Sequence, residues 1–392
     1  MVRGDIIMQI NSTFRFHKVG QGLFYSGILT KTDDTHHNTF SFIYDCGSES
    51  SNFFLYREID EFKHLFPSNK RKLDMLVISH LHEDHVNGLE RLLDGIEVQT
   101  VVMPYINDGL KLLARLELRS DDEFLKEFYT DPVAWFVSKG AKRVLLLGSE
   151  EEEDIYGNIG QQYYEDQDIH IDGVLGISIL DDTQIVYLKK LSTVKCWKFY
   201  WEFCFENLKL TVNRKTYIEI VEDFKKQKCL TLEQIFKSKR LTQELRRKIE
   251  KNYPNAQNRT SVVLLHRPIK KNCSCLIYFN DRYGGFLKEK VEFLNTILTG
   301  DIELRKSDNL ELLSNHDLFC VFQYPHHGSK NNDLKRLSNP NVGFYIISCG
   351  IINRYGHPHN EILEQIQNIV FVNERNAFDY QIIISECKNS QW

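Results

Sequence analysis

The sequence has 392 residues, of which 42% are hydrophobic and 26% are charged, and its net charge at pH 7 is −5. These values are typical of a globular protein with one large domain or two ordinary ones. The sequence has no run of eighteen apolar residues, which excludes a transmembrane helix, and residues 1–5 lack the apolar core of a signal peptide. The cysteines number 9, and several lie in apolar runs, as buried free thiols do. We therefore expect a cytoplasmic protein without membrane contact.

Three strands are predicted near the N-terminus, at residues 14–19, 23–29 and 40–45, because these segments are rich in aromatic and β-branched residues. Gly20-Gln21-Gly22 is predicted to form a tight turn between the first two strands. The third strand ends at Asp45. An aspartate at a strand end can orient a metal-binding histidine through the second ring nitrogen, or it can simply turn the chain.

Four ligand-type residues follow the next predicted strand, residues 73–78, and precede a helix start: His80, His82, Asp84 and His85. His80 and His82 are two positions apart, so both can face one side of an extended loop. Asp84 and His85 come next, as the chain turns into the helix, and can face a second point nearby. Imidazole with carboxylate suits zinc or manganese, and four such residues in six positions argue against a polar loop with chance histidines. The loop therefore predicts a metal site with two positions for metal ions.

Helices and strands alternate around this loop, which favours a sheet covered by helices. The predicted helices are residues 51–66, 107–117 and 121–139, and the predicted strands are residues 98–103 and 143–147. Aromatic residues then alternate from Trp197 to Phe205, which predicts a strand that packs on a core; a base-stacking surface is the alternative.

Residues 209–251 differ from their surroundings, because their apolar side chains recur at helical spacing. This segment holds 13 Lys and Arg against 6 Asp and Glu, a net charge of +7 that leaves −12 on the rest of the chain. We predict short amphipathic helices inserted into the fold. Such a basic insert can contact a phosphate polymer or a protein partner, or it can be a solvated helix face; the sequence leaves these readings open.

Candidate site residues also follow three strands predicted in the C-terminal third of the chain. Asp301 follows residues 296–299, His326 and His327 follow residues 318–323, and the exit of residues 343–348 carries Arg354, Tyr355 and His357. Because loops at strand ends meet at the edge of a sheet, we expect these residues to lie near the histidine loop.

The motif His80-x-His82-x-Asp84-His85 after an apolar strand resembles the signature of the metallo-β-lactamase superfamily. Further segments resemble one branch of it, the soluble hydrolase domain of the competence DNA-uptake protein ComEC. These segments are Val19-Gly20-Gln21-Gly22, Asp45-Cys46-Gly47, Leu298-Thr299-Gly300-Asp301, His326-His327-Gly328-Ser329 and Asn353-Arg354-Tyr355-Gly356-His357-Pro358-His359. The resemblance runs from about residue 13 to residue 366 and leaves the middle of the chain unmatched. It implies an α/β (α+β) fold, a four-layer αββα sandwich spanning residues 1–392 as one domain, with the 209–251 helices outside it.

The resemblance also implies two metal positions. The ligands it implies are His80, His82, Asp84, His85, Asp301, His357 and His327, with Asp84, Asp301 and His327 catalytic. Residues implied to orient ligands or contact substrate are Asp45, Asn258, His326, Ser329, Lys330, Arg354 and Tyr355. Where the superfamily has its third histidine, this chain has Asn258-Arg259-Thr260-Ser261, and His266 lies farther along. His326 or His327 is expected to fill that role, with His327 favoured.

Two neighbouring divalent metal ions, zinc or manganese, lower the pKa of water and clamp the oxygens of an in-line displacement, which suits phosphodiester hydrolysis. The resemblance to a DNA-handling branch and the basic insert favour a phosphodiesterase or nuclease acting on nucleic acid. The alternatives are a small-molecule hydrolase of the lactone, thioester or cyclic-nucleotide type, and a partner protein with a degraded metal site.

Overall fold

The protein is described here by a computed structural model. The residues that it describes are 6–32, 37–66, 71–118, 122–148, 163–166, 169–208, 214–252, 256–269, 274–279, 287–288, 294–304, 308–316, 318–330, 332 and 341–387.

The strands of these segments form one hydrogen-bonded network in which β9 is the turning point between two halves. The first half runs in space as β12 (Ser274–Phe279), β18 (Phe378–Cys387), β1 (Ile6–Phe16), β2 (Phe24–Thr32), β3 (His37–Cys46), β4 (Lys72–Val77), β5 (Glu97–Pro104), β6 (Arg143–Leu147) and β9 (Thr183–Cys196). The second half continues as β10 (Trp201–Glu206), β11 (Val263–Pro268), β14 (Thr296–Leu298), β15 (Leu318–Gln323), β16 (Asn341–Ser348) and β17 (Ile369–Val372). Outside this order, β13 (Leu287–Lys288) pairs with β12, and β7 (Tyr163–Glu165) and β8 (His170–Leu180) extend from β9.

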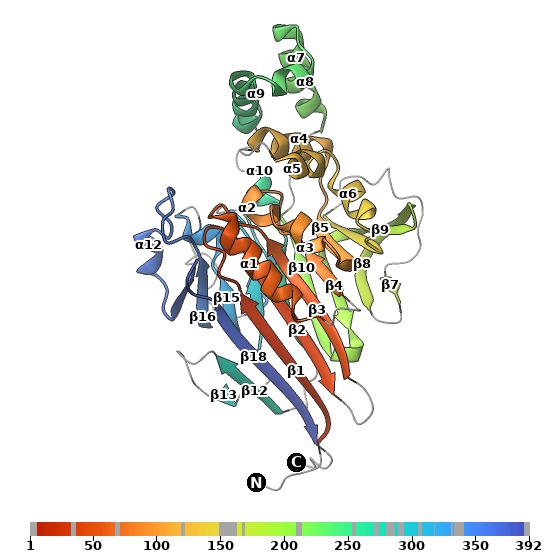
Figure 1. The fold of residues 1–392 in the computed structure, drawn as a ribbon, viewed down its shortest axis with the longest axis vertical. Helices are drawn as coiled ribbons and strands as arrows, with labels where there is room; N and C mark the ends of the chain where they lie inside the picture. The colour runs from red at the N-terminus through yellow and green to blue at the C-terminus, as the bar shows by residue number, and fades with distance from the viewer. Residues whose placement is uncertain are drawn as a thin grey trace.

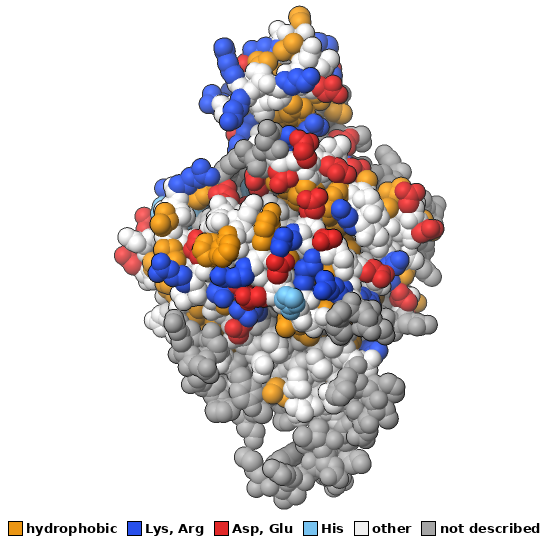
Figure 2. Space-filling model, in the orientation of Figure 1, with side chains coloured by type: hydrophobic (Ala, Val, Ile, Leu, Met, Phe, Trp, Pro, Cys, Tyr) orange, Lys and Arg blue, Asp and Glu red, His pale blue; other side chains and the backbone are white. Residues whose placement is uncertain are grey.

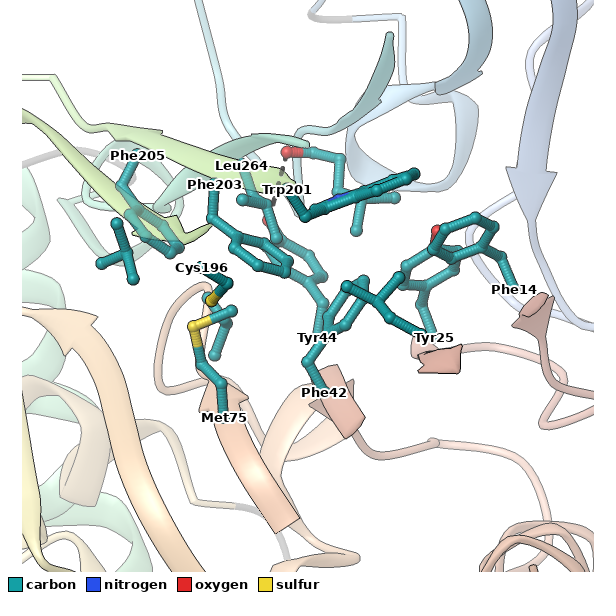
Figure 3. Close-up of a cluster of buried hydrophobic side chains, with 14 of the residues drawn as sticks. Phe14, Tyr25, Phe42, Tyr44, Met75, Cys196, Trp201, Phe203, Phe205 and Leu264 are labelled. Atoms are coloured by element: carbon teal, nitrogen blue, oxygen red, sulfur yellow. Dashed lines mark hydrogen bonds between the residues drawn. The ribbon is translucent and has the colours of Figure 1, made fainter. Parts of the chain in front are cut away.

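The two halves pack face to face through aromatic side chains (Figure 3). The ring of Phe42 in β3 lies 4.9 Å from that of Phe203 in β10, and the ring of Phe14 in β1 lies 5.6 Å from that of Trp201. Because side chains alternate across a strand, the opposite faces of both halves remain for other partners.

Helices cover those opposite faces, so the fold is mixed α/β, as the sequence predicted (Figure 1). One cluster joins the first half to α1 (Asn52–Lys63), α3 (Leu89–Leu93), α5 (Glu123–Phe128) and α6 (Pro132–Ser138). Another joins the second half to α11 (Glu311–Ser314) and α12 (Asn360–Leu363). The strand predicted across residues 197–205 is wrong at its start, where residues 197–199 form the 3₁₀ turn η2 (Trp197–Phe199) and Tyr200 is left-handed with φ 49°.

The basic insert forms α7 (Arg214–Lys228), α8 (Leu232–Phe236) and α9 (Lys239–Asn252), which project at one end of the molecule, opposite the chain termini (Figure 1). Its residues 209–213 lie outside the described segments. The buried side chains of these helices, among them Phe224 and Leu245, share an apolar cluster with Leu110, Leu113 and Leu116 of α4 (Asp108–Glu117). The insert therefore rests on α4. Within the described part of the chain, no helix is both long and apolar enough to cross a membrane.

Candidate metal centre

Five strands end beside one another at the edge of the network that faces the insert. β3, β4 and β5 are parallel, as are β14, β15 and β16, so their carboxyl ends lie together. Asp45 lies near the end of β3, and the segment after β4 carries His80 and His82 and then α2 (Glu83–Val86) with Asp84 and His85. The loops after β14, β15 and β16 carry Asp301, the His326-His327 pair and His357. Each loop is held at its base by a buried strand, which fixes the side chains that it carries.

Asp45 organises the first of these loops, with its carboxylate fully buried and its backbone left-handed at φ 57°. Its Oδ1 accepts from the Ser79 N–H at 2.7 Å, and its Oδ2 accepts from the Ser79 hydroxyl at 2.6 Å. The same Oδ2 lies 2.7 Å from His85 Nδ1. A carboxylate only accepts, so Nδ1 of His85 carries a proton and Nε2 is the nitrogen that faces the cluster.

His80 is held in the same way. Its Nδ1 lies 2.9 Å from the Ser79 oxygen, whose own proton goes to Asp45, so Nδ1 donates and Nε2 is the free lone pair. His80 Nε2 lies 3.0 Å from His82 Nδ1. On the far side of its ring, His82 Nε2 lies 3.1 Å from Glu117 Oε2, which places the His82 proton there. The two ring nitrogens that face each other at 3.0 Å are therefore placed to share a proton or to bind a cation.

The His326-His327 pair is presented by a turn in which both residues are left-handed, with φ 50° and 53°. In an extended exit two adjacent side chains would point in opposite directions, whereas this turn brings both rings toward Asp301. His327 Nδ1 donates to the Ser348 carbonyl at 2.7 Å, and its Nε2 lies 3.2 Å from Asp84 and 3.5 Å from Asp301. His326 Nε2 also faces Asp301, at 3.7 Å, and its Nδ1 lies 3.4 Å from the Asn258 amide.

Glycine allows these loops to approach closely. Gly300 is left-handed at φ 54°, and a Cβ there would lie 2.8 Å from the Cβ of Ser79. A Cβ on Gly47 would lie 2.5 Å from the backbone of Asp84 and His85. Both distances are shorter than real contacts, so the two glycines are required for Asp301 and the histidine loop to meet.

The result is a buried His and Asp cluster that can hold metal. Asp84, His85, Asp301 and His327 form one group of potential ligands, and His80, His82 and Asp301 form another; the ligand atoms within each lie within 4.8 Å of one another. His85 Nε2 and Asp301 Oδ1, 3.3 Å apart, have no hydrogen-bond partner among the described residues. Buried polar atoms are rarely left so, and nitrogen and oxygen donors fit zinc or manganese. The residues therefore fit a metal ion.

Charge in the cluster shifts several pKa values. Burial alone would lower the pKa of His85, but the carboxylates of Asp301, Asp84 and Asp45 raise it well above the ordinary value. Burial would raise the pKa of Asp301, but His327 and His85 hold it well below its usual range. The pKa of His80 is lowered well below its ordinary value, because burial and the neighbouring His85 both disfavour a charged ring. Such strongly perturbed groups in one place are typical of functional sites.

The cluster opens into a cleft of about 180 Å³. Two of its walls were absent from the sequence prediction: Gln21 and Glu49 on one side, and Arg246 and Glu250 of α9 on the other. The lining holds six carboxylates, from Glu49, Glu83, Asp84, Glu117, Glu250 and Asp301, against the one guanidinium of Arg246. The cleft is therefore acidic, and an anionic substrate needs bound cations to enter it.

Some predicted site residues lie apart from the two ligand groups. His357 lines the cleft, and its buried Nδ1 has no hydrogen-bond partner among the described residues. Its ring lies 5.6 Å from that of His326, but His357 belongs to neither group. Tyr355 lines the cleft and donates to Glu49 at 2.6 Å. Ser329 is buried behind the turn, whereas Lys330 and Arg354 are exposed and outside the cleft lining.

Glu117, Gln21, Glu49 and Arg246 line the cleft but were not among the site residues predicted from the sequence. Gln21 and Glu49 adjoin the motifs Gly20-Gln21-Gly22 and Asp45-Cys46-Gly47, which was a usable signal. Glu117 and Arg246 sit in helices without a motif. No protein-family model matches this chain, and no match is found among curated proteins.

Proposed function

We propose that the protein is a metal-dependent hydrolase with the four-layer αββα fold of the metallo-β-lactamase superfamily, and that it cleaves phosphodiester bonds in nucleic acid. The observation that carries the proposal is the pair of buried ligand groups that share Asp301 at one edge of the strand network. Two divalent ions so held would supply Lewis acidity and an activated water at neutral pH.

The side chains of the cleft have distinct tasks in this proposal. His80 and His82 would hold one ion, Asp84, His85 and His327 would hold the other, and Asp301 belongs to both groups. Asp45 keeps His85 with its Nε2 lone pair toward the centre, and the Ser348 carbonyl does the same for His327. His326 and His357, which line the cleft beyond these ligands, are placed to exchange protons with substrate oxygens.

The basic insert supports a polymer substrate. Figure 2 shows Lys and Arg side chains gathered over α7–α9, next to acidic side chains on the body below. The insert adjoins the cleft through Arg246 and Glu250. A nucleic acid that follows the basic surface would reach the cleft, where its scissile phosphate meets the ions.

Hydrolysis assays test the proposal directly. Chelator-treated protein is reloaded with zinc or manganese and given bis-p-nitrophenyl phosphate, single-stranded DNA, duplex DNA, RNA and nitrocefin. We expect metal-dependent cleavage of the small phosphodiester and of at least one nucleic acid. Two bound metals without phosphodiester cleavage would point to another hydrolase class, and the absence of bound metal would favour a partner protein with a degraded site.

A small-molecule substrate is the second candidate, favoured by the small, acidic cleft. The insert distinguishes the two. Lys237, Lys239, Arg240 and Arg247 are exposed, and we expect their joint replacement by Gln to weaken polymer binding and to reduce its salt slope by about 0.7–0.9 per lost phosphate contact. Cleavage of bis-p-nitrophenyl phosphate stays unchanged.

The matched control replaces Lys139, Lys142, Lys189 and Lys198, four exposed lysines outside the insert, and thus changes the net charge equally. Its polymer binding and salt slope are expected to stay near those of the wild type. If both quadruple variants bind polymer as the wild type does, the insert is a solvated face and a small-molecule substrate is favoured.

A further inference from the structure

Glu117 connects the insert to the candidate metal centre. It is the last residue of α4, whose Leu110, Leu113 and Leu116 pack against the insert helices. The Glu117 side chain is only 15% exposed and points into the cleft, where its Oε2 lies 3.1 Å from His82 Nε2. The last residue of α4, the helix that supports the insert, thus contacts a histidine of the ligand cluster.

This contact decides which nitrogen of His82 can bind a cation. Glu117 accepts the Nε2 proton, so Nδ1, which lies 3.0 Å from His80 Nε2, is the nitrogen of His82 that faces the ligand group. His85 and His327 are held by the same device, through Asp45 and the Ser348 carbonyl. Glu117 therefore accepts a proton from the outer ring nitrogen of His82, as Asp45 does from His85. Glu117 lies on a helix, whereas Asp45 lies at a strand end.

Arg246 of α9 holds Glu117 from the other side. Its Nη2 lies 3.5 Å from Glu117 Oε1, and its Nε donates to Glu250 Oε1 at 2.6 Å. α9 is fixed beneath Arg246 by Leu245 and Ile249, which are fully or almost fully buried in the insert cluster. The chain of contacts from the insert to the ligand group is continuous: Arg246, Glu117, His82, His80.

We infer that Glu117 is a positioning residue that orients His82 toward the first metal position, and that Arg246 holds Glu117 in place so that the insert sets the affinity of that position. The inference rests on the proposed function, because it requires that the cluster bind metal. It makes the insert part of the site, as well as a surface for polymer.

Metal affinity without substrate is the direct test, measured by competition with a chelating dye for zinc. For the wild type we expect two equivalents. Removing an outer partner of a metal-binding histidine weakens binding about 10- to 100-fold, so Glu117→Ala should weaken one equivalent by that factor and leave the other unchanged. Glu117→Gln keeps an acceptor oxygen and should lose less, and Arg246→Ala should weaken the same equivalent.

Glu250→Gln is the matched control, because Glu250 lines the same cleft and touches Arg246 but contacts no histidine in the described part of the chain. Its metal affinity should equal that of the wild type. Circular dichroism checks the fold of each variant, and Glu117→Gln keeps the test open if Glu117→Ala does not fold. A positioning role has one further signature: saturating metal restores the Glu117→Gln rate on bis-p-nitrophenyl phosphate.

The outcomes separate the inference from the proposed function. A wild type that binds no metal overturns the proposed function. A wild type that binds two equivalents, with Glu117 variants within about twofold of it, overturns the inference alone. If Arg246→Ala weakens polymer binding but leaves metal affinity unchanged, the role assigned to Arg246 in holding Glu117 is wrong.

Discussion

His85 at the strand-end cleft and His266 in the aromatic core are both fully buried, yet their surroundings shift the two pKa values in opposite directions. Burial lowers the pKa of His266 to about 3, with no carboxylate among the causes. Its Nε2 lies 2.8 Å from the Tyr25 hydroxyl, and rings such as Phe14 surround it (the core of Figure 3). Around His85, three carboxylates raise the pKa by more than burial lowers it.

The difference shows what separates a packed histidine from a ligand. The Tyr25 hydroxyl bonds Nε2 of His266, while Nδ1 has no hydrogen-bond partner among the described residues and no carboxylate acts on the ring, so burial keeps His266 neutral. At the cleft, Asp84, Asp301 and His327 are gathered with His85 at a density that no packing argument requires. Burying several charged groups together is unfavourable unless they are paired or bind metal. The cleft is therefore built for a function, and the core histidine is built for packing.

The first expected effect is on activity. Asp84→Asn and His85→Ala should each reduce phosphodiester hydrolysis more than tenfold, about 1.4 kcal/mol of barrier, because each removes a group from the ligand cluster. Circular dichroism should show an intact fold, since the changes are at a strand-end loop. His359→Ala is the control, because His359 lies outside both ligand groups. Either variant retaining more than a tenth of the wild-type rate would contradict the two-metal assignment.

Bound metal should stabilise the folded protein through residues of the cleft and not through His266 in the core. Adding zinc at about 100 times its dissociation constant to chelator-treated protein should stabilise the fold by about 2.7 kcal/mol, seen as a higher Tm. Asp301→Asn should remove most of this gain, because both groups use Asp301. His266→Gln should keep it. An equal rise in Tm for the wild type and Asp301→Asn would place zinc binding elsewhere.

The third expected effect concerns the response of the core histidine His266 to acidic pH. Its folded pKa of about 3 lies below the unfolded value near 6.5, so the unfolded chain binds the proton first. The stability from neutral His266 is complete above pH 6.5 and falls by about 1.4 kcal/mol per unit as the pH drops toward 3. Between pH 7 and pH 5, His266→Gln should lose about 2 kcal/mol less unfolding free energy than the wild type, as measured in urea. Parallel losses would mean that His266 is already protonated in the fold.

Local chemistry made much of the strand-end site predictable. A buried strand followed by His80, His82, Asp84 and His85 has few readings other than a ligand loop, because the spacing itself aims the side chains. The Gly300-Asp301 turn and the His326-His327 pair could be placed at strand ends by the same reasoning. The alternation of helices and strands indicated a mixed α/β fold, which the structure confirms.

Other features depended on tertiary contacts that no local pattern encodes. The left-handed turn at His326 and His327 brings both rings toward Asp301, against the expectation for an extended exit. The positive charge of the insert was evident from the sequence, but the orientation of the insert was not. The packing of α9 on α4 places Arg246 at the cleft.

The sequence by itself determined that candidate metal ligands follow strands, because ligand type and strand propensity are properties of short segments. It also offered Asp45 as a residue that orients a histidine, but only the tertiary structure placed Glu117 beside His82. Glu117 and His82 are 35 positions apart, and Arg246 is farther still, so their meeting depends on how α4 and α9 pack. Orientation of a ligand is a contact between distant segments, and only the fold supplies it.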